Sequence, residues 1–483
     1  MDATFSCDGF ALKSRLPHFW EHTVGSDHAP MALRADWQAQ LRRCHDELGF
    51  RHVRFHGLLS DDMGTLICHR ASLLYSFFNI DQIFDFLLTI GMRPFVELSF
   101  MPSALASANR TVFHYHGNVT PPRDYQQWAT LIRTLVAHWI ERYGLSEVRE
   151  WFFEVWNEPN LDAFWTGEQS GYFTLYRHTA EAIKTLDAEL RVGGPATAAN
   201  AWISDFVAFC NKNKIPADFI STHHYPTDAF SKEDNDTETQ LSKSPRSVLR
   251  EQAREVRRQA GSKPVYYTEW NTSSNPRDPL HDEPYAAAFV IKTIMEANGL
   301  VQGYSFWTFS DLFEETYFPS VPFHGGFGLL NLHGIAKPVY RAYELLHHVG
   351  TEMLQMEGSH ATVDAWIIFN DHAATILLTN YAPPRQPIAA RSVRIILRNF
   401  GAPANATIQR IDQDHANAKR RWQEMGAPDY LNSAVLAELH AGSRLQDDVQ
   451  PCRFQDGVID LDLTMPPLGV AAVTLQFAER DRG

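Results

Sequence analysis

Two glutamates, Glu158 and Glu269, each close a short apolar segment typical of a β-strand. Glu158 lies in Trp156-Asn157-Glu158-Pro159-Asn160, and Glu269 lies in Tyr267-Thr268-Glu269-Trp270-Asn271. Placing a carboxylate among aromatic side chains is costly unless it serves a purpose. Hydrolysis of a glycosidic bond needs two carboxyl groups, one to protonate the leaving oxygen and one to attack the anomeric carbon. The two glutamates predict this chemistry if the fold brings them to one place.

Eight short apolar segments alternate with helical patterns over about the first 345 residues. They are Trp20–Val24, His52–His56, Pro94–Leu98, Trp151–Trp156, Arg191–Gly194, Phe219–His224, Val265–Trp270 and Gly303–Phe306. This alternation predicts a parallel sheet, and eight strands is the number in a closed (β/α)8 TIM barrel. The carboxyl ends of barrel strands share one rim, so the fourth and seventh strands should deliver Glu158 and Glu269 to the same mouth.

Apolar residues at helical spacing, followed by a glycine, indicate the helices between these strands. The clearest patterns are Asp36–Leu48 before Gly49, Ile80–Ile90 before Gly91, Asp124–Tyr143 before Gly144 and Pro245–Ala260 before Gly261. The polar segment at residues 231–247 is expected to form a long loop after the sixth strand, on the rim of the active site.

The pattern changes near residue 348, where short strands replace most of the helices. These strands are expected at Ala365–Phe369, Ala374–Thr379, Val393–Arg398, Thr407–Ile411 and Val470–Phe477, with a polar helical stretch around His415–Met425. We therefore predict a barrel over residues 15–347 and a C-terminal β-sandwich accessory domain over residues 348–483. Residues 1–14 form an N-terminal segment that can join the sandwich.

The ordered motifs of the chain resemble glycoside hydrolase family 39, and its bacterial β-xylosidases more than its α-L-iduronidases. The matching strings are Val24–Ala29, Val53–Met63, Phe153–Leu161, Ser221–Asp228, Trp307–Asp311 and Asp414–Asn417. The resemblance implies a retaining, exo-acting β-xylosidase that takes part in xylan degradation by releasing terminal xylose from the non-reducing end of xylo-oligosaccharides. It also implies that Glu158 is the general acid/base and Glu269 the nucleophile.

The same resemblance assigns substrate contacts to side chains near the two glutamates. They are Asn157, His56, His223, Tyr225, Trp307, Glu314 and Glu315. Asn157 should bind the sugar 2-hydroxyl, Tyr225 should donate to the nucleophile, and Trp307 should offer a ring to the pyranose. One of Glu314 and Glu315 should accept a sugar hydroxyl, while Glu97 fits either ligand contact or support of its neighbours.

Other interpretations of single residues and of the whole site remain open. His223 and His224 could form a metal pair, but adjacent strand residues point to opposite faces, so no metal and no cofactor are expected. Trp307 could belong to the core, and Gly325–Gly328 indicates a rim loop. A β-glucosidase, an α-L-arabinosidase, an α-L-iduronidase or a non-catalytic sugar-binding protein are the alternative functions. An α-L-iduronidase would need cationic side chains to bind the carboxylate of a uronate. Arg54 lies in a matched motif, but it precedes His56 on the same strand, where a structural role is an alternative to sugar binding.

The composition limits the partners and the compartment. A net charge of −14 disfavours nucleic acid, because phosphate binding needs a surplus of Lys and Arg. Five scattered cysteines without a Cys-x-x-Cys pair favour a reducing compartment. Residues 1–5 do not resemble a signal peptide, and no apolar run is long enough for a membrane span. We expect a cytoplasmic protein with an oligosaccharide substrate, for which an oligomer is possible.

Overall fold

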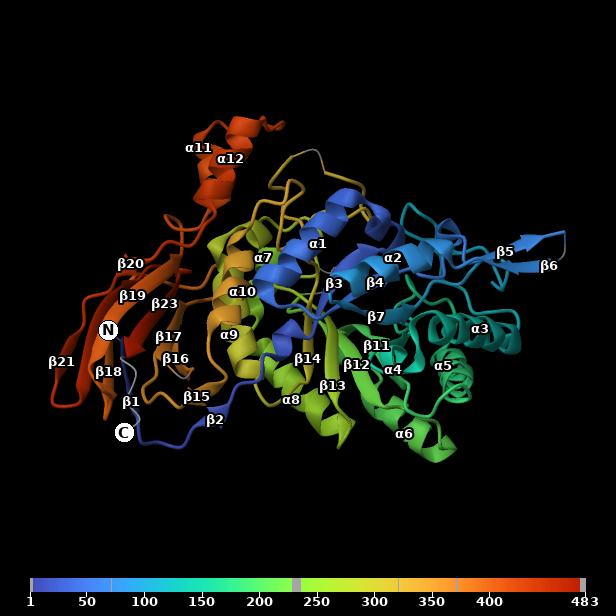
Figure 1. Ribbon diagram of the computed structural model, residues 1–483, viewed down its shortest axis with the longest axis horizontal. Coiled ribbons are helices and arrows are strands. Elements are labelled where there is room, and N and C mark those ends of the chain that lie inside the picture. Colours follow the sequence, from blue (N-terminus) through green and yellow to red (C-terminus); the bar gives the residue numbers. More distant parts are fainter. Residues whose placement is uncertain (1–2, 71, 228–235, 320, 371, 478–483) are drawn as a thin grey trace.

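The computed structural model describes residues 3–70, 72–227, 236–319, 321–370 and 372–477. Eight parallel strands close into a barrel (Figure 1). In chain order they are β3 (Thr23–His28), β4 (His52–His56), β7 (Arg93–Leu98), β10 (Phe152–Val155), β11 (Arg191–Thr197), β12 (Phe219–His224), β13 (Val265–Trp270) and β14 (Gly303–Phe306). The ring closes where Phe306 of β14 pairs with Val24 of β3. The expected (β/α)8 barrel is thus confirmed.

Helices connect the barrel strands and cover their outer face. They are α1 (Ala35–Leu48), α2 (Phe78–Thr89), α3 (Tyr125–Tyr143), α4 (Leu145–Val148), α5 (Gln169–Lys184), α6 (Ile203–Asn213), α7 (Thr237–Lys243), α8 (Val248–Ala260), α9 (Pro284–Ala297) and α10 (Pro338–His348). The helices expected from periodicity are α1, α2, α3 and α8. Gly49 ends α1 at φ 75°, a left-handed conformation that glycine adopts without steric cost. Two short hairpins, β5 (Leu66–His69) with β6 (Ser72–Tyr75) and β8 (Thr111–Val112) with β9 (Gly117–Asn118), extend the loops.

Aromatic side chains fill the barrel at the end where its strands begin. Phe95, Phe152, Phe219 and Tyr266 form one buried cluster, and the rings of Phe95 and Phe152 stack at 5.1 Å. Strand side chains alternate in direction, so residues two positions further along also point inward. This arrangement leaves the other end of the barrel for polar residues.

Two expectations about local structure need correction. The first barrel strand was expected at Trp20–Val24, but a 3₁₀ helix occupies Phe19–Glu21 and β3 begins at Thr23. Trp20 is fully buried in the core and stacks on His18, which explains its strand-like apolar signal. The segment at residues 231–247 is not all loop, because α7 forms within it. Residues 228–235 lie outside the described residues.

The second region contains two sheets with a shared core. One sheet has the order β2 (Ser14–Arg15), β15 (Glu352–Leu354), β16 (Val363–Phe369), β17 (Ala373–Asn380), β23 (Val470–Phe477), β19 (Pro403–Ile411) and β20 (Asp448–Val449). The other has the order β1 (Ala3–Asp8), β18 (Arg391–Arg398), β22 (Val458–Met465) and β21 (Arg453–Gln455). Phe5, Ile376, Ile395, Leu461 and Val473 pack between them. Strand β1 runs parallel to β18, and β2 pairs with β15. The domain limits at residues 14 and 347 stay a prediction.

A pair of short helices, α11 (Ala418–Glu424) and α12 (Ser433–Gly442), projects from this second region (Figure 1). Helix α11 lies in the polar stretch for which a helix was expected. Helix α12 was not expected, because it buries few residues and its pattern is correspondingly weak. Its amino end is capped by the Asn432 side chain, which accepts hydrogen bonds from the amides of Ala434 and Val435.

The seven-stranded sheet packs against the barrel through α9. Tyr285 and Phe289 of α9 contact the ring of Tyr381, which follows β17. Arg246, in front of α8, donates to the Tyr381 carbonyl and to Asp364 of β16. Among the residues described here, no helix has both the length and the apolar character to cross a bilayer.

Candidate active site

A break in strand register aims Glu269 into the barrel mouth. Tyr266 points into the aromatic layer, so strict alternation makes Thr268 point inward as well, and Thr268 donates to the buried Glu154 carboxylate at 2.7 Å. The pairing of β12 with β13 then shifts, so that His223 lies opposite Glu269 rather than Thr268. Such bulges re-aim side chains near functional sites. Here the bulge turns Glu269 toward the same space as Thr268.

Glu158 reaches this space by leaving its strand. Strand β10 ends at Val155, and both Trp156 and Glu158 have positive φ values, 73° and 44°. Residues other than glycine adopt this conformation at a cost, so the surrounding structure must hold it. The amide of Glu158 donates to the Ala196 carbonyl at 2.8 Å, which fixes the turn. The result places the Glu158 carboxylate beside β12.

His223 lies between the two glutamates. Its Nδ1 is 2.9 Å from Glu158 Oε1 and 3.6 Å from Glu269 Oε2. One ligand atom of each of the three residues lies within 4.8 Å of the others. Burial, with the charges of Arg54 and His56, lowers the pKa of His223 well below its usual value, so the ring is neutral. The carboxyl groups are therefore close together on either side of a neutral donor.

Arg54 is the buried centre of the charge network. Its guanidinium donates to Glu154 at 2.5 Å, to Glu269 at 2.8 Å and to the Asn157 side-chain oxygen at 3.0 Å. A further contact of 2.8 Å joins it to Glu97. Burial raises the pKa of Glu269, and the Arg54 guanidinium is the largest influence in the opposite direction. Arg54 thus favours the ionised form that a nucleophile needs.

Tyr225 supplies another donor to Glu269. Its hydroxyl lies 3.0 Å from Glu269 Oε2, while Arg54 contacts Oε1. Burial raises the pKa of Tyr225 well above its usual value, so the hydroxyl keeps its proton and can donate. Both carboxylate oxygens of Glu269 are therefore bound by donors, which holds the group in one orientation.

His56, Trp307 and Glu315 meet next to Glu269. His56 Nε2 is 3.6 Å from Glu269 and 3.5 Å from Glu315, and its ring contacts that of Trp307 at 4.7 Å. Glu97 accepts from His56 Nδ1 at 2.7 Å and from Arg54, which places Glu97 behind the site as a support. Ser99 also donates to Glu97. Burial raises the pKa of Glu97, but Arg54 and His56 outweigh it and the pKa is lowered.

The two neighbouring glutamates after β14 point to different places. Glu314 Oε1 pairs with His28 at 2.7 Å, and the Glu314 amide donates to Asp27. Glu315 Oε1 is buried and finds no hydrogen-bond partner within the described part of the chain. Burial, with Asp27 and Glu269, raises the pKa of Glu315 well above its usual value. Glu315 rather than Glu314 therefore faces the site with an unused polar atom.

Two residues of the site were not assigned a role in it from the sequence. Arg54 was considered structural and Glu154 was not singled out, although both hold the site together. The sequence contains a signal for these residues. Arg54, Glu97 and Glu154 are charged residues within otherwise apolar strands, and a buried charge can be accommodated only in the polar part of the barrel interior above the aromatic layer. Residues Glu97 and Glu154 pair directly across β7 and β10.

The site has few features of a metal centre. His224 points away from His223 and contacts the Tyr304 hydroxyl at 2.7 Å, as strand alternation predicts. Glu158, His223 and Glu269 could in distance hold an ion. The guanidinium of Arg54, 3.4 Å from His223 Nε2, places a positive charge against one. Hydrogen bonding and proton transfer are the chemistry that these residues support.

Known proteins resemble the chain over nearly its whole length. The model of glycosyl hydrolases family 39 matches residues 11–457. A β-xylosidase of Caldicellulosiruptor saccharolyticus is 50% identical over 469 residues, which are 96% of this chain and 96% of that protein. A β-xylosidase of Geobacillus stearothermophilus is 37% identical over 95% of this chain and 92% of its own. The crystal structure of a monomeric β-xylosidase from Caulobacter crescentus CB15 superposes with a TM-score of 0.88 at 34% identity, covering 98% and 99% of the two chains. The chain belongs to glycosyl hydrolases family 39.

Proposed function

We propose that this chain is a retaining, exo-acting β-xylosidase that removes terminal xylose from the non-reducing end of xylo-oligosaccharides. One observation carries the proposal: carboxylate oxygens of Glu158 and Glu269 lie within 4.8 Å of each other at the barrel mouth. Retaining enzymes hold their carboxyl groups about 5–5.5 Å apart, whereas inverting enzymes need about 6.5–9.5 Å for a water molecule. The two relatives described as β-xylosidases support the choice of sugar.

In the proposed reaction, Glu269 attacks the anomeric carbon while Glu158 protonates the leaving oxygen. Arg54 and Tyr225 keep the Glu269 carboxylate ionised and oriented for attack. Glu158 then takes a proton from water, which attacks the glycosyl-enzyme and releases β-xylose. Each step inverts the anomeric centre once, so the overall result is retention.

The terminal sugar is proposed to lie against Trp307, with its hydroxyls within reach of His56 and Glu315. Glu315 Oε1 is a buried polar atom that a sugar hydroxyl would satisfy. Asn157 would bind the 2-hydroxyl, since Arg54 fixes its side-chain oxygen and so leaves its amide nitrogen as the donor. Glu314 is left out of this sugar site because its carboxylate binds His28.

A panel of aryl β-xyloside, β-glucoside, α-L-arabinoside and β-galactoside substrates tests the sugar. We expect the highest kcat/KM with the β-xyloside, and NMR of the first product should show β-xylose before it mutarotates. Glu269→Gln, purified in the same way, controls for contaminating enzymes. A preference for another glycoside would contradict the specificity, and α-xylose as the first product would contradict the retaining mechanism.

We also propose that the protein acts in the cytoplasm and does not bind nucleic acid. All five cysteines are free, which suits a reducing compartment. A charge of −14 repels phosphate backbones. Activity recovered with cytoplasmic marker enzymes after cell fractionation would support the location, and activity in the culture medium would contradict it.

A further inference from the structure

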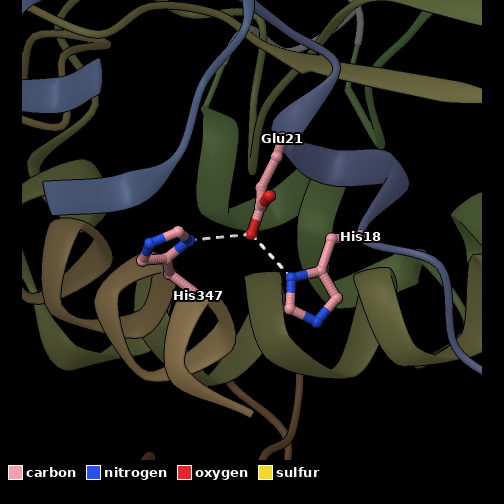
Figure 2. Close-up of side chains that lie close together, drawn as sticks. All are labelled: His18, Glu21 and His347. Carbon is pink, nitrogen blue, oxygen red and sulfur yellow. Dashed lines mark hydrogen bonds and ion pairs between the residues drawn. The ribbon is translucent and has the colours of Figure 1, made fainter. Parts of the chain in front are cut away.

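A second cluster of ionisable side chains lies where the barrel strands begin, at the end opposite the candidate active site. His18 and Glu21 precede β3, and His347 lies in the last turn of α10 (Figure 2). Both imidazoles point to the same oxygen: Glu21 Oε1 is 2.7 Å from His18 Nδ1 and 2.9 Å from His347 Nδ1. The three side chains are 16%, 13% and 31% exposed, so small ions in solvent can reach them.

The contacts of His18 favour a cation at this point. His18 Nε2 lies 3.2 Å from the Gly350 carbonyl, which can only accept a hydrogen bond. If Nε2 carries the proton, the lone pair of Nδ1 faces the carboxylate oxygen of Glu21, and the two would repel. Either a proton between the two atoms or a metal ion between them resolves this conflict. Metal-binding histidines typically donate their other ring N–H to a carbonyl or carboxylate, as His18 is placed to do.

The surrounding structure holds the three side chains in place. The ring of His18 stacks on Trp20 at 4.5 Å, which fixes its plane. Gly49 forms a wall of the cluster, since a side chain there would lie 2.6 Å from the His347 ring and 3.0 Å from the Glu21 carboxyl carbon. Arg51 donates its amide to the Glu21 carbonyl, which secures the backbone. The cluster is thus organised before any ion binds.

We propose that His18, Glu21 and His347 bind one divalent transition-metal ion of the zinc type, with water completing the coordination. Two imidazole nitrogens and one carboxylate suit Zn²⁺, Ni²⁺ or Co²⁺ and disfavour Mg²⁺ and Ca²⁺, which prefer oxygen ligands. Tetrahedral zinc at about 2.0–2.2 Å from each ligand needs ligand atoms roughly 3.4 Å apart. The two His–Glu distances of 2.7 and 2.9 Å therefore have to open by less than about 1 Å.

Such an ion would join parts of the chain that are more than 300 residues apart. Glu21 is followed directly by the first barrel strand, and His347 is followed directly by the link to the second region. In that link, Leu16 donates to the Thr351 carbonyl and β2 pairs with β15. The ion would link the segment that precedes the first barrel strand to the end of α10, the helix that follows the last barrel strand. It would stabilise the fold rather than act on the sugar.

Titration of the untagged full-length chain with ZnCl2, after treatment with chelator and desalting, tests the proposal. We expect saturable binding by calorimetry and a rise in Tm of at least about 2 °C at 100 times Kd. His347→Gln and His18→Gln should each weaken binding at least tenfold and reduce the rise in Tm at the same zinc concentration by about half or more. The matched control is His348→Gln, which replaces the exposed neighbour of His347 and should leave both unchanged.

Zinc bound at the active-site glutamates is recognised separately, because it would inhibit hydrolysis of an aryl xyloside and would persist in His347→Gln. Absence of saturable binding in the wild-type chain would overturn the proposal and leave a hydrogen-bonded His–Glu–His group. Zinc binding of equal strength in a folded His347→Gln or His18→Gln variant would also overturn it.

Discussion

Glu158 and Glu269 are both glutamates at the barrel mouth, but they differ in the side chains that contact their carboxyl groups. Glu269 receives hydrogen bonds from Arg54 and Tyr225 on its two oxygens, an environment that favours a carboxylate. Glu158 contacts the ring of His223, whose Nδ1 lies 2.9 Å from Glu158 Oε1. The contacts of Glu269 support the proposed division into nucleophile and acid, which can be tested by removing each carboxyl group.

Glu269→Ala should lose activity on every substrate by about 10⁴-fold or more, because no glycosyl-enzyme can form. Glu158→Ala should still form the glycosyl-enzyme from an activated aryl xyloside, whose leaving group needs no proton. Its turnover should be limited by deglycosylation, since no base remains to activate water. Sodium azide, which needs no base, should restore turnover of Glu158→Ala and give the β-xylosyl azide by NMR.

The control is the same azide titration on Glu269→Ala. Azide can enter its vacant nucleophile position only from the opposite face, so any product should be the α-azide. If Glu269→Ala gave the β-azide and Glu158→Ala did not, the two roles would be exchanged.

The hydroxyl of Tyr225 should set the acid limb of the pH profile. As the proposed nucleophile, Glu269 must be ionised to attack, so activity should fall as the pH drops through its pKa. Burial already raises this pKa, and Tyr225→Phe removes a donor that stabilises the ionised form. A hydrogen bond to a charged group contributes about 1.5–3 kcal/mol, and 1.36 kcal/mol corresponds to one pKa unit. The acid limb of kcat/KM should therefore move up by about one pH unit or more.

Tyr267→Phe is the matched control for this measurement. Tyr267 lies on the same strand as Glu269 and is fully buried, and its hydroxyl has no hydrogen-bond partner in the described part of the chain. Its removal should leave the acid limb unchanged. An unshifted limb in Tyr225→Phe would mean that this hydroxyl does not stabilise the ionised nucleophile.

The strands and helices of the barrel were largely predictable, because their apolar periods follow from burial. The direction of Glu269 was not, since strict alternation from Tyr266 points Thr268 inward and Glu269 outward. The register shift between β12 and β13 that corrects this leaves no mark in the apolar pattern. The sequence also could not show whether Glu314 or Glu315 faces the site. The answer depends on the position of His28, which binds Glu314.

At the scale of elements, a buried lysine fixes the loop that follows β14. Lys337, in front of α10, contacts Asp282 at 2.8 Å and Asp311 at 2.7 Å and donates to the Gly326 carbonyl. Gly325–Gly328 was interpreted as a rim loop. The amides of Gly325 and Gly328 donate to the same two aspartates, Asp282 and Asp311. The ion triad thus positions a loop that packs under Trp307 through Phe327.

Lys337→Met should lower the free energy of unfolding by about 3–5 kcal/mol, because two buried carboxylates lose their counter-ion. Burial alone would raise the pKa of Asp282. The charge of Lys337, together with other contacts, outweighs this effect and lowers the pKa below its usual value. Denaturant unfolding measures the loss. Lys13→Met, which breaks a half-exposed pair with Glu352, should cost no more than about 1 kcal/mol. Equal losses in the two variants would show that burial does not set the strength of the Lys337 contacts.

At the scale of the whole molecule, the first and the last described strands, β1 and β23, both belong to the second region, one in each of its sheets. Figure 1 places the amino terminus beside the β-rich region, where β1 covers the edge of β18. Ala3, Phe5 and Cys7 alternate along β1 and are all buried, although no strand was predicted here and only a segment that can join the sandwich was expected. Pairing with residues nearly 400 positions away leaves no local signal. The short strands after residue 348 predicted the sandwich, but only the family resemblance indicated that the N-terminal segment joins it.

Phe5→Ala tests whether this first strand holds the second region together. Phe5 is 4% exposed in the core between the two sheets, so its truncation should cost about 3–5 kcal/mol. Hydrogen exchange should increase in peptides of β18 and β22, whereas peptides of the barrel strands and the kcat on an aryl xyloside at 25 °C should stay unchanged. Phe10→Ala is the matched control, because Phe10 is 83% exposed and should change stability by no more than about 0.5 kcal/mol. If Phe5→Ala instead increased exchange in the barrel and the second region together, the two would unfold as one unit, and the predicted division near residue 347 would not be a folding boundary.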